Sequence, residues 1–231
     1  MSNSLIFGRR AQGKSTLAFS LAQLAGLSIV VFDVNAQFGC VPPDAVLTNP
    51  DDFELFLTDP PGSLVAYRPE SDVEEEFTGF ADLLWPRHGY TLIIDEASQI
   101  QSPGRAHPRL DRLVRMGSRQ GVNLIQALHR PTDAATICRS LARHWYVFRS
   151  RQQTDLDVIA ERCGPAVAET AGALGEHEYV HWDDDREVSE VVKDAGSWFV
   201  DIDAAPQVEP EGEDENASEQ LPTVRDALTT A

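Results

Sequence analysis

The chain has 231 residues, of which 42% are hydrophobic, with a formal net charge of −18 and three cysteines. This length suits one domain with appendages, and the charge argues at first sight against a nucleic acid partner. No run approaches the roughly 18 apolar residues of a membrane helix, so we expect no membrane span. Cys40, Cys138 and Cys163 show no metal-site spacing and cannot all pair with one another, which favours a reducing, intracellular setting.

The first predicted elements enclose a phosphate-binding loop. An apolar run from Leu5 ends at Gly8, four residues follow, and Gly13-Lys14-Ser15 opens a helical pattern. This is the Gly-x-x-x-x-Gly-Lys-Ser/Thr motif in its required context of strand, loop and helix. The motif predicts a nucleotide-binding segment made of Gly8, Arg9, Arg10, Ala11, Gln12, Gly13, Lys14, Ser15 and Thr16.

Each residue type in this loop has a physical reason. Gly8 and Gly13 let the backbone turn tightly with its N–H groups facing inward, and the following helix directs its positive dipole end at the same point. Lys14 is expected to reach the β- and γ-phosphates of ATP. Ser15 would ligate Mg²⁺ through its hydroxyl, and Thr16 would lie near the α-phosphate.

A second part of the ligand crevice is expected after the next strand. The pattern predicts a helix over 17–27 and a buried strand over 28–33 that ends in Asp33. Loops at the carboxyl end of a parallel strand face the ligand crevice, so Asp33 either helps to order Mg²⁺ or water or simply caps its loop. Further along we expect a short helix over 50–58, a strand over 64–68 and a helix over 72–84.

Two adjacent carboxylates follow the next strand. The strand-forming segment from Tyr90 to Ile94 runs directly into Asp95 and Glu96. A buried strand in this position delivers Asp95 to the Mg²⁺ shell, and Glu96 can polarise a water for attack on the γ-phosphate. The pair indicates hydrolysis of a nucleoside triphosphate by water rather than phosphoryl transfer to a small molecule.

The middle of the chain is unexpectedly basic. Residues 101–108 are predicted to form a loop and residues 109–118 a helix. Residues 105–151 carry a net charge of +8. This segment is either a solvated helix face or an arginine surface for the phosphates of DNA or of a neighbouring subunit's nucleotide. Its ten arginines are Arg105, Arg109, Arg112, Arg115, Arg119, Arg130, Arg139, Arg143, Arg149 and Arg151.

The remaining pattern alternates strands and helices and then changes in composition. From about residue 204 the sequence is rich in Ala, Pro, Glu, Asp and Ser, and we predict a disordered acidic tail over 204–231 after an ATPase domain over 1–203. Before the tail we predict strands over 121–128 and 144–149, helices over 132–144, 154–163 and 166–174, and a hairpin of 178–182 with 187–192.

Together these features predict a RecA-like α/β P-loop NTPase with a mostly parallel sheet flanked by helices, and one stretch narrows the class further. The segment from Arg119 to Pro131 resembles the part of the FtsK/HerA superfamily of DNA-pumping ATPases that reads Arg-x-x-Gly-(Ile/Val)-x-Leu-x-x-Ala-Thr-Gln-Arg-Pro. The resemblance covers about residues 4–160. Within that superfamily, the small size of the chain resembles that of the genome-packaging ATPases of membrane-containing viruses of the tectivirus and vaccinia type.

The resemblance implies roles for individual residues. Lys14, Asp95 and Glu96 would be catalytic, with Ser15 and Asp95 as the metal-binding pair. The family's sensor glutamine falls at His129, which can still hydrogen-bond a γ-phosphate or its water but makes that role pH-sensitive. The family's arginine finger would stand at Ser118, so Arg119 or Arg115 must replace it, and we prefer Arg119.

The resemblance also implies an assembly and its partners. It implies a ring of six copies with ATP and Mg²⁺ at each subunit boundary, which pumps double-stranded DNA into a preformed capsid. Residues 101–109 would form a DNA-contacting loop, with Arg105 and Arg109 binding backbone phosphates. Capsid vertex proteins are a further expected partner, and the expected location is the host cytoplasm or the virion.

Three other classes remain open. A nucleoside kinase also joins a phosphate loop to an Asp-Glu strand end, although it would leave the arginine segment without a purpose. A filamentous-phage-type assembly ATPase that exports DNA usually carries a membrane span. A regulatory nucleotide-binding module would not need Glu96 beside Asp95.

Overall fold

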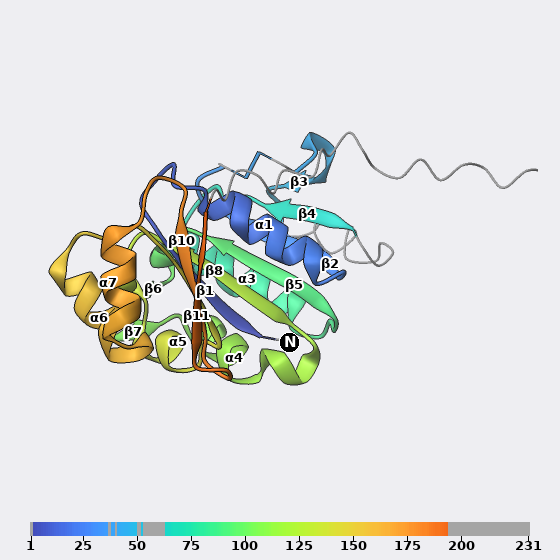
Figure 1. Ribbon diagram of the computed structural model, residues 1–231. Helices are drawn as coiled ribbons and strands as arrows, with labels where there is room; N and C mark the ends of the chain where they lie inside the picture. The colour runs from blue at the N-terminus through green and yellow to red at the C-terminus, as the bar shows by residue number, and fades with distance from the viewer. Residues whose placement is uncertain (1, 37, 40, 50–51, 53–62, 194–231) are drawn as a thin grey trace, which may run out of the picture. The chain divides into compact units, whose positions relative to one another are not determined.

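A 9-stranded sheet forms the centre of the protein, with strands in the order β11-β10-β9-β1-β8-β5-β2-β4-β3 (Figure 1). The computed structural model describes residues 2–36, 38–39, 41–49, 52 and 63–193. The strands are β1 (Asn3–Phe7), β2 (Ser28–Asp33), β3 (Val46–Leu47), β4 (Leu64–Tyr67), β5 (Tyr90–Asp95), β8 (Asn123–Leu128), β9 (His144–Phe148), β10 (Tyr179–Asp183) and β11 (Val188–Val192).

The strands from β9 to β3 run parallel to one another. Leu128 lies beside Phe7 on β1, and Asp33 lies beside Asp95 on β5. The carboxyl ends of these strands therefore meet at one edge of the sheet, where ligands bind in open α/β sheets. The predicted mostly parallel sheet is confirmed.

The hairpin of β10 and β11 extends this sheet. Strand β10 pairs antiparallel with both β9 and β11. It begins at Tyr179, beside Phe148 at the carboxyl end of β9, and the connection before it reaches the phosphate loop. There the ring Nδ1 of His177 lies 3.3 Å from the carbonyl oxygen of Gln12. The sequence prediction of a hairpin is confirmed, with its strands displaced by about one residue.

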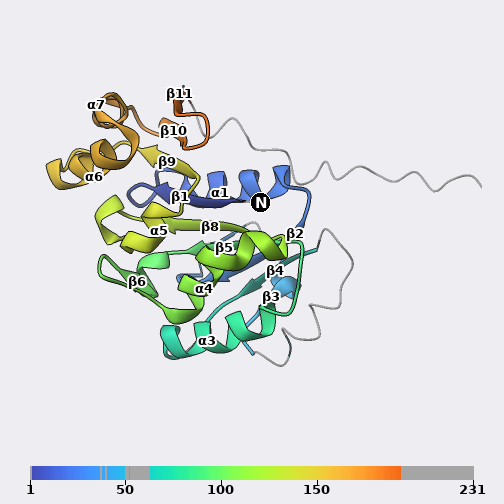
Figure 2. The same cartoon turned by 90° about the horizontal axis from the view of Figure 1, so that it is seen from below.

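Helices cover both faces of the sheet (Figure 2). Side chains alternate along β1, so that Ile6 faces α1 while Leu5 and Phe7 face the opposite core. The core on the side of Ile6 contains residues of α1. The core on the side of Leu5 and Phe7 contains residues of the other long helices. The helices are α1 (Lys14–Leu24), α3 (Val73–Leu84), α4 (Pro108–Met116), α5 (Thr136–Ser140), α6 (Gln153–Cys163) and α7 (Pro165–Ala173).

Two predicted elements differ from the structure. The loop expected over 101–108 contains a small antiparallel ribbon of β6 (Gln101–Ser102) and β7 (Arg105–Ala106), followed by Pro108 at the start of α4. The helix expected over 132–144 is reduced to a 3₁₀ turn, Pro131–Asp133, and the short helix α5. The backbone N–H of Thr136 at the start of α5 donates to the carbonyl of Pro103, so a tertiary contact with the ribbon replaces helix continuation.

Some predictions fall outside the described residues. The short helix expected over 50–58 and the acidic tail expected over 204–231 belong to these, and both stay predictions. Within the part of the chain that the structure describes, no helix is both long enough and apolar enough to cross a membrane.

Candidate functional site

The loop between β1 and α1 has the backbone that its sequence motif requires. Gly13 adopts a φ of 99°, a left-handed conformation that favours glycine, directly before the first residue of α1. Gly8 is required for a different reason, because an added Cβ would lie 2.9 Å from the Cβ of Phe148. The loop is thus tightly seated on the end of β9, with the amino terminus of an 11-residue helix behind it.

Lys14 points back into this loop. Its Nζ donates to the carbonyl oxygen of Arg9 at 3.2 Å, and the residue is only 8% exposed. Burial lowers the pKa of Lys14, while the carboxylates of Glu96 and Asp95 oppose that shift. The loop therefore holds a buried cation in the position where an anionic ligand would neutralise it.

Ser15 and Asp95 meet across 80 positions of sequence. The Ser15 hydroxyl lies 3.5 Å from Oδ1 of Asp95, and Asp95 is 5% exposed. Burial raises the pKa of Asp95 to about 6, helped by the neighbouring carboxylate of Asp33 and opposed by Lys14. Hydroxyl and carboxylate oxygens are the donors that Mg²⁺ prefers, and a cation would relieve the cost of ionising Asp95. These residues fit a magnesium site.

Glu96 is held from two sides. Its Oε2 lies 3.0 Å from Nε2 of His129, and its Oε1 accepts from the Ser98 hydroxyl at 2.7 Å. The backbone of Glu96 is left-handed, with a φ of 58°, which costs a non-glycine residue roughly 1 kcal/mol or more. That conformation carries the chain away from the end of β5 while the side chain stays near His129. The structure therefore brings the predicted Glu96 and His129 into direct contact.

Asp33 is a structural anchor in this geometry. Its carboxylate, which is fully buried, accepts from Nε of Arg68 at 2.8 Å and from the backbone N–H of Phe38. Of the two roles left open by the sequence, the contacts match the capping of the loop after β2. Asp33 still lies beside Asp95 in the sheet and raises its pKa, so it influences the site through charge.

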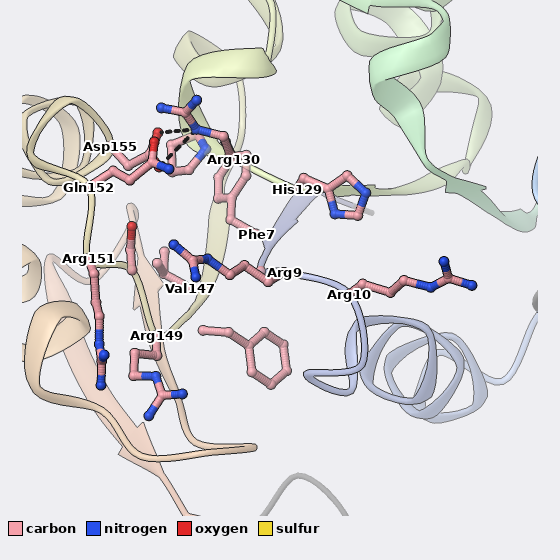
Figure 3. A pocket seen from close by; sticks show the side chains of 14 residues that line it. Phe7, Arg9, Arg10, His129, Arg130, Val147, Arg149, Arg151, Gln152 and Asp155 are labelled. Atoms are coloured by element: carbon pink, nitrogen blue, oxygen red, sulfur yellow. Dashed lines mark hydrogen bonds and ion pairs between the residues drawn. The ribbon is translucent and has the colours of Figure 1, made fainter.

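An arginine-lined cavity of about 210 Å³ opens on the other side of the loop, at the ends of β1, β8 and β9 (Figure 3). Arg130 is bound there to the buried carboxylate of Asp155, at 3.1 Å. The Arg10 side chain points away from the other arginines in Figure 3. The polar and charged lining consists of Arg9, Arg10, His129, Arg130, Arg149, Ser150, Arg151, Gln152 and Asp155.

Arg119 lies far from the phosphate loop of its own chain. It is exposed in a 3₁₀ turn, Gly117–Gln120, before β8 begins at Asn123. The six residues of β8 span about 20 Å and end beside the loop. Any contact of Arg119 with a nucleotide phosphate must therefore be made in another copy of the chain. The alternative, Arg115, is bound to Asp111 within α4 at 2.9 Å.

The two arginines predicted to bind DNA are engaged with α3. Arg105 on β7 contacts Glu74 at 2.9 Å, and Arg109 on α4 contacts Asp82 at 2.7 Å. Both pairs are partly exposed, so solvent screens them and exchange for another anion costs little. The predicted arginine surface is thus largely balanced by carboxylates within the chain. Other ion pairs of the basic segment are made by Arg115, Arg130, Arg143 and Arg149.

Sequence reasoning missed several residues of this edge. Arg68 follows a parallel strand directly, and the rule that placed Asp33 and Asp95 at the carboxyl edge would have found it too. Arg149 and Arg151, which the sequence placed only among the ten arginines of the basic segment, follow β9 in the same way and line the cavity at this edge. Gln126 is a polar residue inside an apolar strand, which is a usable signal for a buried hydrogen-bond network.

Comparisons with known proteins support the fold. No protein-family model matches the sequence, and no curated protein is a significant relative of it. Among solved structures, the genome packaging NTPase B204 from Sulfolobus turreted icosahedral virus 2 in complex with ATP-gammaS superposes with a TM-score of 0.69 at 20% identity. The match covers 84% of this chain and 98% of that one.

Two further structures give the same result. The complex of the same B204 with AMPPCP has a TM-score of 0.70 at 20% identity, covering 84% of this chain and 97% of that one. B204 from Sulfolobus turreted icosahedral virus, described as a DNA-packaging ATPase, has a TM-score of 0.65 at 22% identity, with coverage of 84% and 97%. The chain therefore shares its fold with these packaging NTPases, which confirms the RecA-like P-loop fold that the sequence predicted.

Proposed function

We propose that this chain is an ATP hydrolase that pumps double-stranded DNA into a viral capsid. The observation that carries the hydrolase part is the convergence of Lys14, Ser15, Asp95, Glu96 and His129 at the carboxyl edge of one sheet. These residues come from three separate segments, and the pairs Ser15–Asp95 and Glu96–His129 join them. That set supplies phosphate binding, metal binding and water activation at one place.

Nucleotide binding begins with the loop from Gly8 to Thr16. Its backbone N–H groups and the amino terminus of α1 would surround the phosphates, as the helix dipole favours. Lys14 would exchange the Arg9 carbonyl for the β- and γ-phosphate oxygens and Thr16 would approach the α-phosphate. The arginine-lined cavity continues from this loop, and the planar guanidinium groups of Arg9 and Arg149 suit the nucleoside end of the ligand.

Ser15 and Asp95 would hold Mg²⁺ together with the phosphates. Bound there, the metal would neutralise charge on the β- and γ-phosphate oxygens. Asp95, whose pKa is raised by burial, would hold a water ligand of the ion. Asp33, held by Arg68, would keep the neighbouring strand end in place.

Glu96 would act as the general base for the attacking water. General bases of this kind contribute about 10²- to 10⁴-fold to rate. In the structure one oxygen of Glu96 contacts His129 and the other contacts Ser98, so both have a partner. His129 would leave Glu96 for the γ-phosphate or its water once ATP is bound, which would free the carboxylate to accept a proton. His129 thus would sense whether the γ-phosphate is present.

The DNA-pumping part of the proposal rests on different support. The fold is shared with B204, whose description is a DNA-packaging ATPase, over almost the whole length of that protein. The ribbon of β6 and β7 follows Glu96 closely and presents Arg105, which is exposed, with Arg109 on the adjoining helix. These arginines would release Glu74 and Asp82 to bind DNA phosphates, independently of sequence.

The remaining parts of the proposal concern assembly. A ring of six copies would place Arg119 of one copy at the nucleotide of the next, where an arginine stabilises charge that develops during phosphoryl transfer. Residues 1–203 would form the motor and 204–231 an acidic tail. The motor would work in the host cytoplasm, with capsid vertex proteins as its docking partners, and would be associated with the virion.

The test compares ATP turnover with and without double-stranded DNA in the wild type and in Glu96→Gln. We expect DNA to stimulate the wild type, and we expect Glu96→Gln to bind ATP but to lose about 10²- to 10⁴-fold in turnover. Turnover that ignores DNA, or phosphate transferred to a nucleoside, would reject the motor and favour the kinase. A Glu96→Gln variant with wild-type turnover would reject the role of Glu96.

A further inference from the structure

Three amide side chains form a buried chain beneath the candidate site. Nε2 of Gln101, on β6, donates to Oε1 of Gln126 on β8 at 2.9 Å. Nε2 of Gln126 then donates to Oδ1 of Asn3 on β1 at 3.0 Å. Gln126 is fully buried, and Gln101 and Asn3 are 7% and 9% exposed. This polar chain lies among the apolar residues that β8 shares with α3 and α4.

Both ends of the chain are also bound to backbone. Oε1 of Gln101 accepts from the N–H of Ala135 at 2.9 Å, and Nδ2 of Asn3 lies 3.5 Å from the carbonyl of Cys138. Every amide in the chain thus has a partner for its oxygen and for its nitrogen. Buried polar groups stabilise one arrangement when all of them are satisfied, and shifting one member leaves others unpaired. The network therefore fixes the ribbon at one position relative to β8.

The amide pair connects the two segments that carry Glu96 and His129. Gln101 follows Glu96 with only residues 97–100 between them, which comprise a 3₁₀ turn, Ala97–Gln99, and the buried Ile100. Gln126 precedes His129 by three residues, near the end of β8. The pair Glu96–His129 and the pair Gln101–Gln126 are thus two cross-links between the same two segments.

The outer end of the ribbon faces solvent. Ser102, Pro103, Gly104 and Arg105 are exposed at its tip, whereas Gln101 at its base is buried. Pro103 at the tip also accepts from Thr136, and Arg105 pairs with Glu74, but the buried base is the part of the ribbon that leads to the candidate site. Gln101 at the base is connected to Glu96 by the intervening residues of the chain. It is connected to the segment of His129 by its hydrogen bond to Gln126.

We propose that Gln101 and Gln126 are positioning residues that couple contact with DNA at the ribbon to the Glu96–His129 pair. This inference rests on the proposed function. Contact at the tip would shift Gln101 against Gln126 and thereby change how Glu96 and His129 face each other. The amide pair thus makes ATP hydrolysis responsive to DNA, without touching the nucleotide or the DNA.

Gln101→Met tests this coupling, because methionine keeps the length of the side chain and removes its hydrogen bonds. The matched control is Gln99→Met, two residues away, where the glutamine is exposed. The measurement is the ratio of ATP turnover with DNA to turnover without it. DNA affinity by fluorescence anisotropy, ATP-analogue affinity and the thermal unfolding midpoint are recorded for each variant.

We expect Gln101→Met to bind DNA and nucleotide like the wild type while its stimulation ratio falls toward one. Gln99→Met should keep the wild-type ratio. A purely structural role would lower only the unfolding midpoint, so an unchanged ratio in Gln101→Met would overturn the inference. If Gln101→Met does not fold, Gln101→Met combined with Gln126→Met and Asn3→Leu decides, since removing all three side-chain amides leaves none of them facing an apolar side chain in place of its partner.

The outcome also separates this inference from the function on which it rests. A wild type that DNA does not stimulate would reject DNA pumping, and the coupling with it. A stimulated wild type with an equally stimulated amide variant would reject the coupling alone.

Discussion

The contact between Glu96 and His129 is the central feature at the residue scale. A histidine stands where the resembling superfamily has glutamine, and its Nε2 lies 3.0 Å from the carboxylate that would activate water. Glutamine and histidine can both hydrogen-bond a carboxylate or a phosphate oxygen. The substitution therefore preserves a hydrogen-bonding group at this position and adds a titratable one.

His129→Ala should lower kcat by about 10- to 100-fold, the usual cost of losing a partner that orients a reacting group. The KM for ATP should change less than kcat, because the loop from Gly8 to Thr16 would supply most of the contacts with the phosphates. His129→Gln should retain most activity, since the amide can replace both contacts. Steady-state kinetics on the three proteins checks this, and wild-type kcat in His129→Ala would contradict the proposed role.

Asp95 makes a prediction about stability and pH. Its pKa rises from 3.8 to about 6 in the folded, metal-free chain, so the folded state takes up a proton in that interval that the unfolded state does not. Ionised Asp95 therefore costs stability above pH 6, and the cost disappears as the pH falls toward 4. Asp95→Asn removes this cost at all pH values.

Without Mg²⁺, Asp95→Asn should thus raise the free energy of unfolding at pH 7.5 by about 1 to 3 kcal/mol. The gain should vanish near pH 4, while Mg²⁺-dependent ATP turnover is lost at every pH. Urea unfolding of both proteins between pH 4 and 7.5 measures the difference. A gain that does not depend on pH would show that burial of the charge is not its cause.

At the scale of elements, the sequence predicted what local rules determine. The strand over 28–33 was predicted with its observed bounds, because an unbroken β-branched run can only be a buried strand in this context. The phosphate loop and the pair Asp95–Glu96 were found because their spacing is a chemical requirement. Their meeting at one edge followed from parallel strand order.

Tertiary contacts determined what the sequence did not predict. The ribbon of β6 and β7 is stabilised by Gln126, by Thr136 and by Ala135, none of which is near it in sequence. The helix expected over 132–144 is short because the start of α5 pairs with that ribbon. Long-range hydrogen bonds of this kind produce no periodic pattern of residues that sequence analysis could detect.

We predict that Arg119 acts at the interface between two copies of the chain. Because it lies at the opposite end of β8 from its own phosphate loop, Arg119→Ala should act on a neighbour and lower kcat by about 10³- to 10⁵-fold. Mixing Arg119→Ala with Glu96→Gln should restore part of the activity. In a mixed ring, some subunit boundaries join the nucleotide site of an Arg119→Ala copy, which keeps Glu96, to a Glu96→Gln copy, which keeps Arg119. Such boundaries contain both residues and should be active.

Arg115→Ala is the control for this experiment, since Arg115 is bound to Asp111 within its own helix. It should keep most of the wild-type turnover. Full activity in Arg119→Ala together with loss in Arg115→Ala would show that Arg115 is the residue that acts in the neighbouring site. Absence of any rescue on mixing would argue against a shared site.

At the scale of the whole molecule, charge is separated along the chain. The basic segment of +8 lies within a chain of net charge −18, and Glu74 and Asp82 hold the arginines nearest the ribbon. DNA must compete with these carboxylates, so its binding should be weak and sensitive to salt. Release of counterions makes the logarithm of affinity fall linearly with the logarithm of salt concentration.

Arg105→Ala combined with Arg109→Ala should weaken DNA binding uniformly across sequences and reduce the salt slope by about 1 for each phosphate that is no longer neutralised. Arg143→Ala is the matched control, because Arg143 lies before β9 and binds Asp185 at 2.6 Å. Titrations of two unrelated duplexes at several salt concentrations measure both effects. An unchanged slope in the double variant would place the DNA elsewhere.

ATP-driven movement along duplex DNA is the central claim, and displacement of a triplex-forming oligonucleotide tests it most directly. The wild type should release a labelled third strand from double-stranded DNA in the presence of ATP and Mg²⁺. Glu96→Gln should bind the same DNA and nucleotide without releasing it. ATP hydrolysis by the wild type on this DNA with the third strand left in place would contradict the account.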